Sequence, residues 1–287
     1  MNELLFLKPV LKNMVWGTEN WVVSAHPSGD CVVSEGTYAG QTLSELWDGH
    51  RELFNNEEGE RFPLLVKLIN AEQDLSVQVH PDDAYAWKNE NRSLGKAECW
   101  YVLDADPEKK LIFGHNATSR KDAEEMIRRG DWNTFLKRVS IKPGCFIQID
   151  PGTVHSTCSG MKMIEIQQNS ELTYRLYDHD RLFNGKPREL HIQKALDVIK
   201  TPDTSEDRVF PAFPEDGFFT SFYKIRKVCI NGEQEFTQNE SFQILSVADG
   251  SGTIDGHKIR QDDSLIIPYG YGTYTIRGQI EILITSL

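Results

Sequence analysis

The chain has 287 residues, of which 39% are hydrophobic and 26% are charged, and this composition is that of an ordinary globular protein with one large or two medium domains. Its formal net charge of -12 argues against nucleic acid or an anionic membrane as the main partner, because both need clustered Lys and Arg. Five cysteines without a CxxC pair, no run near ~20 apolar residues and no signal-peptide pattern predict a cytoplasmic protein with reduced thiols.

Strand signals dominate the chain, and three segments have a helical period. We expect these helices at residues 41–56, 119–139 and 188–200. The second one begins with Ser119 followed three residues later by Asp122, which is an N-cap signature, and Gly130 is expected to split it. Its apolar residues predict stripes that face the core. The helices should therefore cover a β framework.

Residues 74–83, with the sequence DLSVQVHPDD, show the period-two pattern of a strand. Leu75, Val77 and Val79 form an apolar face. The opposite face carries Ser76, Gln78 and His80, side chains that can hydrogen-bond or ligate, where a solvent-facing strand would more often carry Lys, Glu or Thr. The alternative reading is an edge strand wetted by solvent.

Residues 201–216 hold three prolines and no periodicity, which predicts a linker. Short strands follow it, and the pairs Asn231-Gly232 and Asp255-Gly256 predict hairpin turns, because both central turn positions favour a positive φ. The C-terminal part is therefore expected to be a small all-β sandwich or barrel. Residues 260–278 also resemble residues 142–160 in their strand, turn and strand pattern, but place Gly272 opposite His155.

Four dispersed residues offer ligands for a divalent metal. Glu98 precedes a strand-like apolar run, where a carboxylate is costly to bury unless it is paired or bound to a cation. His155 follows a Pro-Gly turn. With Gln78 and His80 they supply two imidazoles, one carboxylate and one amide oxygen, a set that can hold a metal and leave positions for water or substrate.

The chain resembles the short bacterial form of type I mannose-6-phosphate isomerase. The motifs that carry the resemblance are WGTENWVVSAHPSG (16–29), LLVKLINAEQDLSVQVHPDD (64–83), GKAECWYVL (95–103), PGTVHS (151–156) and EIQQNSELTYRLYDHDR (165–181). The resemblance implies interconversion of mannose 6-phosphate and fructose 6-phosphate, a small sugar phosphate as substrate, and one zinc ion per chain. Matched position by position, it implies metal ligands at Gln78, His80, Glu98 and His155 and a catalytic arginine at Arg175.

The fold implied by this resemblance is mostly β, with two cupin (jelly-roll) β-barrel domains and a few covering helices. Residues 1–200 are expected to form the N-terminal metal-binding cupin domain, 201–216 the linker, and 217–287 a degenerate C-terminal cupin domain without metal. The chain lacks the large helical insertion of longer members, so phosphate contacts mapped in those members do not transfer directly. Oligomeric state is left undecided.

The chemistry of the implied reaction suggests roles for further residues. Lys96 lies two positions before Glu98, so on an extended strand both should point into one pocket, where Lys96 would contact substrate and assist catalysis. Ser76 should likewise face inward and meet a phosphate or sugar hydroxyl. Glu165 and Asp178 are both candidates for the base, and the sequence does not choose between them.

Two other functions fit parts of the pattern. His, His and Glu also suit iron, so an iron-dependent cupin oxygenase is an alternative, although Arg175 and Lys96 suit an anionic sugar better than dioxygen. A non-catalytic sugar-binding regulator on the same fold is another alternative. The presence of Glu98, His155 and Arg175 argues against loss of catalysis. For Arg175, a surface ion pair with Asp178 or Asp180 is the structural alternative.

Overall fold

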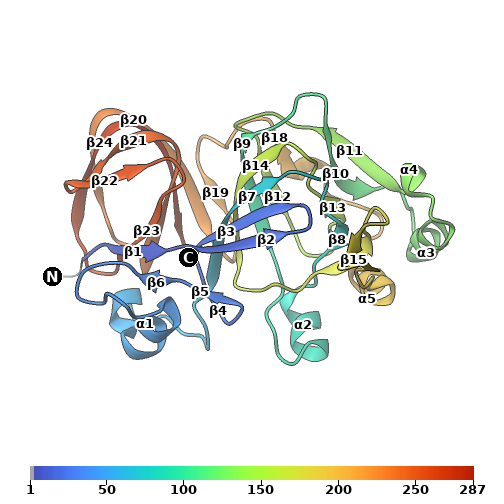
Figure 1. The fold of residues 1–287 in the computed structure, drawn as a ribbon, viewed down its shortest axis with the longest axis horizontal. Helices are drawn as coiled ribbons and strands as arrows, with labels where there is room; N and C mark the ends of the chain where they lie inside the picture. Colours follow the sequence, from blue (N-terminus) through green and yellow to red (C-terminus); the bar gives the residue numbers. More distant parts are fainter. Residues whose placement is uncertain (1–2) are drawn as a thin grey trace. The chain divides into compact units, whose positions relative to one another are not determined.

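The computed structural model describes residues 3–287, which are mostly β (Figure 1). The chain divides into two compact units that interleave along the sequence. One contains the N-terminal segment up to Lys12, Asn20–Leu68 and Phe213–Leu287, and the other contains Asn13–Glu19 and Ile69–Ala212. The predicted domains are continuous stretches instead, and their boundaries stay a prediction. No helix among residues 3–287 is long and apolar enough to cross a bilayer.

The first unit is built on an eight-stranded antiparallel sheet. In sheet order, its strands are β19 (Phe218–Phe219), β20 (Lys224–Thr237), β24 (Thr273–Ser286), β21 (Phe242–Ile254), β23 (Ser264–Pro268), β1 (Leu5–Lys8) and β6 (Val32–Val33), with β22 (His257–Arg260) paired to β21. This unit also holds the short pair β4 (Ala25–His26) and β5 (Gly29–Asp30), helix α1 (Leu43–Gly49) and the 3-10 turn η1 (Arg51–Phe54). N-terminal strands thus complete a sheet made mainly of C-terminal ones.

Two sheets organise the second unit. The five-stranded sheet has the order β11 (Leu136–Ser140), β10 (Lys110–His115), β13 (His155–Ser156), β8 (Val77–Val79) and β15 (Tyr174–Tyr177). The seven-stranded sheet has the order β18 (Val209–Phe210), β12 (Phe146–Ile149), β9 (Glu98–Asp104), β14 (Met161–Gln168), β7 (Leu64–Ala71), β3 (Gly17–Val23) and β2 (Val10–Met14). Its last three strands run across the division between the units. A separate hairpin joins β16 (Leu182–Phe183) to β17 (Lys186–Pro187).

The first two predicted helices are confirmed at their starts. Within 41–56, α1 begins after Thr42, whose side chain forms a capping box with Glu45, and η1 follows it. Within 119–139, α3 (Arg120–Arg129) begins after Ser119, which accepts a hydrogen bond from the Asp122 N–H. It ends at Gly130 with φ +66°, a left-handed cap that favours glycine, and the short α4 (Trp132–Phe135) follows.

The helix prediction is wrong for residues 136–139. They form β11, which pairs with β10 at the edge of the five-stranded sheet, with Val139 opposite Leu111. The apolar spacing that suggested a helix also fits a strand with one buried side, and the available edge of β10 decides between them. The core-facing prediction holds for Ala123, Ile127 and Phe135, which are all buried.

The third helix is shorter than predicted, and a fourth was not predicted. Within 188–200, only α5 (Ile192–Val198) is helical. The additional helix α2 (Asp83–Asn89) begins after Asp82, whose side chain accepts from the Tyr85 N–H, so an N-cap signal was present. In the predicted linker 201–216, the 3-10 turn η2 (Glu206–Arg208) leads into β18, which pairs with β12.

One of the two predicted hairpin turns is wrong. Asp255-Gly256 does connect β21 to β22, with φ +45° and +88°. Asn231-Gly232 instead lies inside β20, which pairs with β24 along its full length. Gly232 stands opposite Gly278, which in turn stands opposite Gly252 on β21. The glycines of this row permit close approach of three long strands, so no turn forms there.

Helices α3, α4 and α5 of the second unit cover the outer face of its five-stranded sheet (Figure 1). Val77 and Val79 of β8 pack into a core cluster with Phe135 of α4 and Leu196 of α5. Because side chains alternate along a strand, Gln78 points to the opposite, inner face. The inner face of the seven-stranded sheet carries a second cluster, which includes Trp100, Ile147 and Met163. Polar side chains on these inner faces are therefore enclosed.

The architecture confirms a mostly β fold of the cupin type, although neither large ladder of the second unit closes on itself within residues 3–287. The resemblance between 142–160 and 260–278 has a local counterpart, because both segments form a strand, a turn with a left-handed glycine, and a return strand. Gly152 and Gly270 supply these glycines, with φ +87° and +71°.

The glycine row yields a test of the first unit's sheet. Gly278 has φ +149°, and a Cβ there would lie 2.4 Å from Ser251 O. Gly278→Ala should therefore destabilise the protein by at least about 2 kcal/mol, measured as a lower midpoint in thermal or urea unfolding. Gly49→Ala is the control, because its Cβ would meet no atom within 4 Å. Equal midpoints for the two variants would contradict the close-approach explanation.

Candidate metal centre

One cross-strand row on the five-stranded sheet gathers three of the predicted site residues. Gln78 of β8 stands directly opposite His155 of β13 on one side and Arg175 of β15 on the other. Residues directly opposite each other in an antiparallel ladder point to the same face, so all three point inward. The period-two alternation of residues 75–80 is confirmed. The solvent-wetted alternative is wrong, because Ser76 and His80 are also buried.

The seven-stranded sheet supplies the carboxylates. Glu98 is the first residue of β9, and it pairs with Ile149 of β12 and Gln167 of β14. Two residues further along β9, Trp100 stands opposite Glu165. Glu98, Trp100, Glu165 and Gln167 therefore lie on the same face of neighbouring strands, and all four are buried.

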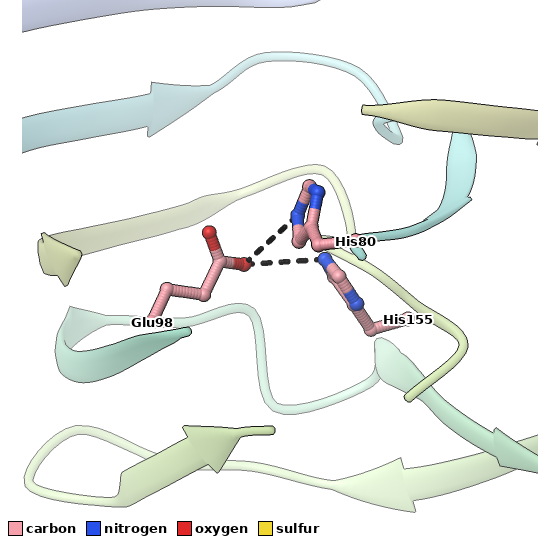
Figure 2. Close-up of side chains that lie close together, drawn as sticks. All are labelled: His80, Glu98 and His155. Carbon is pink, nitrogen blue, oxygen red and sulfur yellow. Dashed lines mark ion pairs between the residues drawn. The ribbon is translucent and has the colours of Figure 1, made fainter. Parts of the chain in front are cut away.

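His80, Glu98 and His155 meet at one point between the sheets (Figure 2). Glu98 Oε1 lies 3.5 Å from His80 Nε2 and 3.2 Å from His155 Nε2. One ligand atom from each residue falls within 4.8 Å of the others, a geometry that can hold a metal ion. All three side chains are fully enclosed, with exposed fractions of 0%. The structure thus brings together three residues separated by up to 75 positions, from residue 80 to residue 155.

Backbone carbonyls set the orientation of both imidazoles. His80 Nδ1 lies 2.7 Å from Leu172 O, and His155 Nδ1 lies 3.0 Å from Thr153 O. A carbonyl oxygen can only accept a hydrogen bond, so each Nδ1 carries the proton and donates it. In the neutral form of each ring, Nε2 carries the lone pair and faces Glu98 Oε1. This is the arrangement in which histidine typically ligates a metal, with the outer nitrogen held by an acceptor.

The charges at this point are strongly coupled. Burial alone would raise the pKa of Glu98, but Lys96 and His80 lower it well below its usual value. Burial and the neighbouring Lys96 ammonium lower the pKa of His80 to about 3, so its imidazole is neutral near pH 7. The site therefore presents one carboxylate and a neutral imidazole, the forms that bind a divalent cation.

These donors fit a divalent metal. Among residues 3–287, neither oxygen of the buried Glu98 has a well-aligned hydrogen-bond donor, although Lys96 Nζ is 2.5 Å from Oε2. A buried carboxylate with one oxygen facing two imidazole nitrogens is a donor set found at zinc sites. Gln78 is adjacent, with Nε2 3.3 Å from His155 Nε2 and Oε1 accepting from Ser76. Ligation through Oε1 would require its amide to turn over.

Ser76 joins Gln78 to Arg175. The hydroxyl of Ser76 donates to Gln78 Oε1 at 3.3 Å and accepts from Arg175 Nε at the same distance. Arg175 also donates through Nη1 to the carbonyl of Glu189 at 2.8 Å. Burial and the neighbouring Arg188 lower the pKa of Arg175. Its guanidinium is therefore held in place beside the Gln78 row, and these contacts differ from the surface ion pair considered above.

Lys96 and Glu165 complete the enclosed cluster. The predicted alignment of Lys96 with Glu98 is confirmed by their ion pair, and Lys96 Nζ also lies 3.5 Å from His80 Nε2 and 3.9 Å from Glu165 Oε1. The indole N–H of Trp100 donates to Glu165 Oε2 at 2.9 Å, while its ring meets His155 edge-on with centroids 5.5 Å apart. Trp100 was not among the predicted site residues, although its place two residues after Glu98 was the available signal.

Asp178 has a different environment from the other predicted residues. Its carboxylate accepts from Arg181 Nη2 at 2.7 Å and from Arg188 Nε at 2.7 Å. Burial would raise the pKa of Asp178, but Arg188 and Arg181 lower it. Sequence reasoning did not foresee either arginine. The i,i+3 spacing of Asp178 and Arg181 was one usable signal, whereas Arg188 arrives through the hairpin of β16 and β17.

Family models match both ends of the chain. Residues 4–110 match the catalytic domain of type I phosphomannose isomerase, and residues 212–287 match the cupin domain of mannose-6-phosphate isomerase. The mannose-6-phosphate isomerase ManA of Bacillus subtilis is 40% identical, and the alignment covers 99% of each chain.

Solved structures show the same similarity. The crystal structure of the Bacillus subtilis mannose 6-phosphate isomerase superposes with a TM-score of 0.94 at 38% identity, covering both chains completely. A zinc-bound mannose 6-phosphate isomerase is similar in fold, with a TM-score of 0.79 at 14% identity and 99% of each chain covered.

The environment of Asp178 generates a prediction about stability. Asp178→Asn leaves Arg181 and Arg188 without their counter-charge and should lower the free energy of unfolding by roughly 2 kcal/mol at pH 7. Because the pKa of Asp178 is lower in the folded than in the unfolded state, its contribution is present above pH ~4 and disappears as the pH falls further. Urea unfolding at pH 7 and pH 3 measures both effects.

Asp180→Asn is the matched control for this prediction, since Asp180 is exposed and its carboxylate accepts, among residues 3–287, only from the Tyr177 hydroxyl at 3.3 Å. Its effect should stay within about 0.5 kcal/mol. The ion-pair argument would be refuted by an Asp178→Asn effect that persists undiminished at pH 3.

Proposed function

Because the chain belongs to the type I phosphomannose isomerase family, we propose that it interconverts mannose 6-phosphate and fructose 6-phosphate using one bound zinc ion. The observation that carries this proposal is the buried carboxylate of Glu98 facing two imidazole nitrogens in an enclosed site. The proposed zinc ligands are Gln78, His80, Glu98 and His155.

Zinc would act in this reaction as a Lewis acid towards an oxygen of the sugar. The ligand set supports zinc, because two imidazoles and one carboxylate form a common catalytic zinc site. The same ligands also suit iron, so the identity of the metal is part of what we propose and is tested by metal analysis. Gln78 would add its amide oxygen.

The reaction moves a proton between adjacent carbons through an enediol, so it requires a base. We assign this role to Glu165. Its carboxylate lies 3.9 Å from Lys96 in the enclosed cluster, and the Trp100 indole N–H orients it. Asp178 is the weaker candidate, because two arginines already occupy its oxygens and stabilise its charged form.

Lys96 and Arg175 would stabilise negative charge on the substrate oxygens. The Lys96 ammonium lies between Glu98 and Glu165, where it can also exchange protons with a sugar hydroxyl. Arg175 uses Nε and one N–H of Nη1 for Ser76 and Glu189, so it retains further donors of its planar fork for an oxyanion. Ser76 would contribute a hydroxyl to substrate binding.

The remaining assignments extend the proposal to the whole protein. The metal would lie in the N-terminal cupin domain, residues 1–200, joined by the linker 201–216 to a degenerate cupin domain, residues 217–287, without metal. We also propose a cytoplasmic location. Four of the five free cysteines are buried, which supports their role as apolar filling in a reducing compartment.

Two measurements test the function. Metal analysis of protein purified without added metal should find about one zinc per chain, and a coupled assay should detect fructose 6-phosphate formed from mannose 6-phosphate. Iron with oxygen uptake would support the oxygenase alternative. Tight sugar binding without turnover would support the regulator. Either result, without isomerisation, would refute the proposal.

His155→Ala should abolish zinc binding and activity while the protein stays folded. The loss of affinity should exceed the about 10–100-fold that removal of an outer hydrogen-bond partner typically costs. Zinc retention after gel filtration measures metal binding, and the circular dichroism spectrum shows whether the variant is folded. His115→Ala is the matched control, because His115 is also buried but its Nε2 donates to Lys200 O, outside the cluster. It should keep zinc, and zinc retention by His155→Ala would exclude His155 as a ligand.

Arg175→Ala should keep zinc and lose rate. Removing a donor that stabilises an oxyanion costs about 3 kcal/mol of barrier, which corresponds to roughly a hundredfold lower kcat. Arg175→Lys retains the charge without the planar fork, so its kcat should lie between those of the wild type and Arg175→Ala. Steady-state kinetics with zinc content measured in parallel will separate rate from metal loss. Normal turnover in Arg175→Ala would remove Arg175 from the mechanism.

A further inference from the structure

The carbonyl that orients His80 belongs to an irregular segment. Leu172 O accepts from His80 Nδ1 at 2.7 Å, yet residues 169–173 lie in no helix or strand between β14 and β15. His155, by contrast, is held by Thr153 O in its own tight turn, two residues away. The direction of Leu172 O must therefore be fixed by side chains, because no ladder or helix fixes it.

The side chain of Gln167 holds the start of this segment through hydrogen bonds to its backbone. Its side chain is fully buried, and its amide Nε2 donates to Gln168 O at 3.0 Å and to Ser170 O. Both partners are carbonyls, which only accept, so they determine which end of the amide faces them. Gln167 also stands opposite Glu98 in the ladder of β14 and β9. One amide thus holds the carbonyls of Gln168 and Ser170 in place beside the candidate metal centre.

Ser170 continues the connection to Leu172. The Ser170 hydroxyl, itself buried, donates to Leu94 O at 2.9 Å and accepts from the Leu172 N–H at 3.3 Å. The residue whose carbonyl holds His80 is therefore anchored through its own N–H. The other end of this anchor, Leu94, lies two residues before Lys96. The segment is therefore bonded to the stretch of chain that leads through Lys96 into β9 at Glu98.

We propose that Gln167 and Ser170 are positioning residues for the metal centre, which fix the Leu172 carbonyl and thereby hold His80 in the tautomer that leaves Nε2 able to bind a metal. The inference rests on the metal-binding part of the proposed function. It assigns a task to two buried polar side chains whose hydrogen bonds go to the backbone.

The alternative tautomer explains why this bracing matters. If Leu172 O moves away, His80 Nδ1–H loses its acceptor in an enclosed site, where an unpaired donor is unfavourable. His80 can then place its proton on Nε2 instead and donate it towards Glu98 Oε1, 3.5 Å away. In that form Nε2 has no lone pair for a metal. The bracing residues thus disfavour a competing hydrogen bond within the site.

Zinc affinity of the full-length protein tests the proposal directly. Zinc-loaded Gln167→Met and Ser170→Ala are equilibrated with a chromophoric chelator, and each should bind zinc about 10–100-fold more weakly than the wild type. In both variants, the ¹⁵N shifts of the histidine ring nitrogens should show a larger fraction of the Nε2–H tautomer at His80 than in the wild type. The absorption spectrum of the cobalt-substituted protein should change as the ligand geometry loosens.

Gln238→Met is the matched control for a purely structural effect. Gln238 is buried in the other unit, and its Nε2 likewise donates to two carbonyls, Ile267 O and Pro268 O. Ser246→Ala similarly removes a buried hydroxyl, one that pairs with Ser264. Both controls should lower the unfolding midpoint while zinc affinity stays within about twofold, a factor that corresponds to ~0.4 kcal/mol.

Zinc affinities of Gln167→Met and Ser170→Ala within twofold of the wild type, with His80 in the same tautomer, would overturn the inference. This outcome is distinguishable from failure of the proposed function. A wild type that binds zinc but does not isomerise mannose 6-phosphate would refute the function alone. If the protein is an isomerase but its zinc affinity is unchanged by Gln167→Met and Ser170→Ala, only the positioning role is refuted.

Discussion

The site depends on one buried carboxylate. Glu98 is fully enclosed, and a carboxylate in that position is tolerated only beside compensating cations or cation-binding partners. Lys96 lies 2.5 Å from one of its oxygens, and two imidazole nitrogens face the other. Removing Lys96 or a bound metal would leave negative charge without adequate compensation, so the charge of Glu98 links metal binding to the stability of the strands around it.

Two sheets meet around this charge because each contributes one row of side chains. The five-stranded sheet places His155, Gln78 and Arg175 side by side, and the seven-stranded sheet places Glu98 beside Gln167. Helices cover the outer face of the first sheet, so its inner face can be polar without exposing the core. The candidate site therefore lies in the interior of the second unit, where electrostatic interactions are strong.

An outer layer of backbone carbonyls gives the two imidazoles their direction. Thr153 O is set by a tight turn, whereas Leu172 O is set by Gln167 and Ser170 through an irregular segment. The same short stretch of chain then enters β15 and delivers Arg175 to the site. A displacement of this stretch would move both His80, a proposed metal ligand, and Arg175, so its internal hydrogen bonds belong to the support of the candidate site.

Local sequence determined the strand alternation at residues 75–80, the N-cap at Ser119 and the Asp255-Gly256 turn, because each depends on neighbours within a few residues. The family motifs also pointed to Gln78, His80, Glu98 and His155, and the structure brings the last three within reach of one ion. Tertiary structure decided the rest. Asn231-Gly232 remained inside a strand because β24 pairs along its whole length, residues 136–139 became a strand because β10 offered a free edge, and Asp178 became an ion-pair partner because a hairpin returned Arg188 to it. These outcomes depend on contacts between distant segments, whose free energies outweigh local preference.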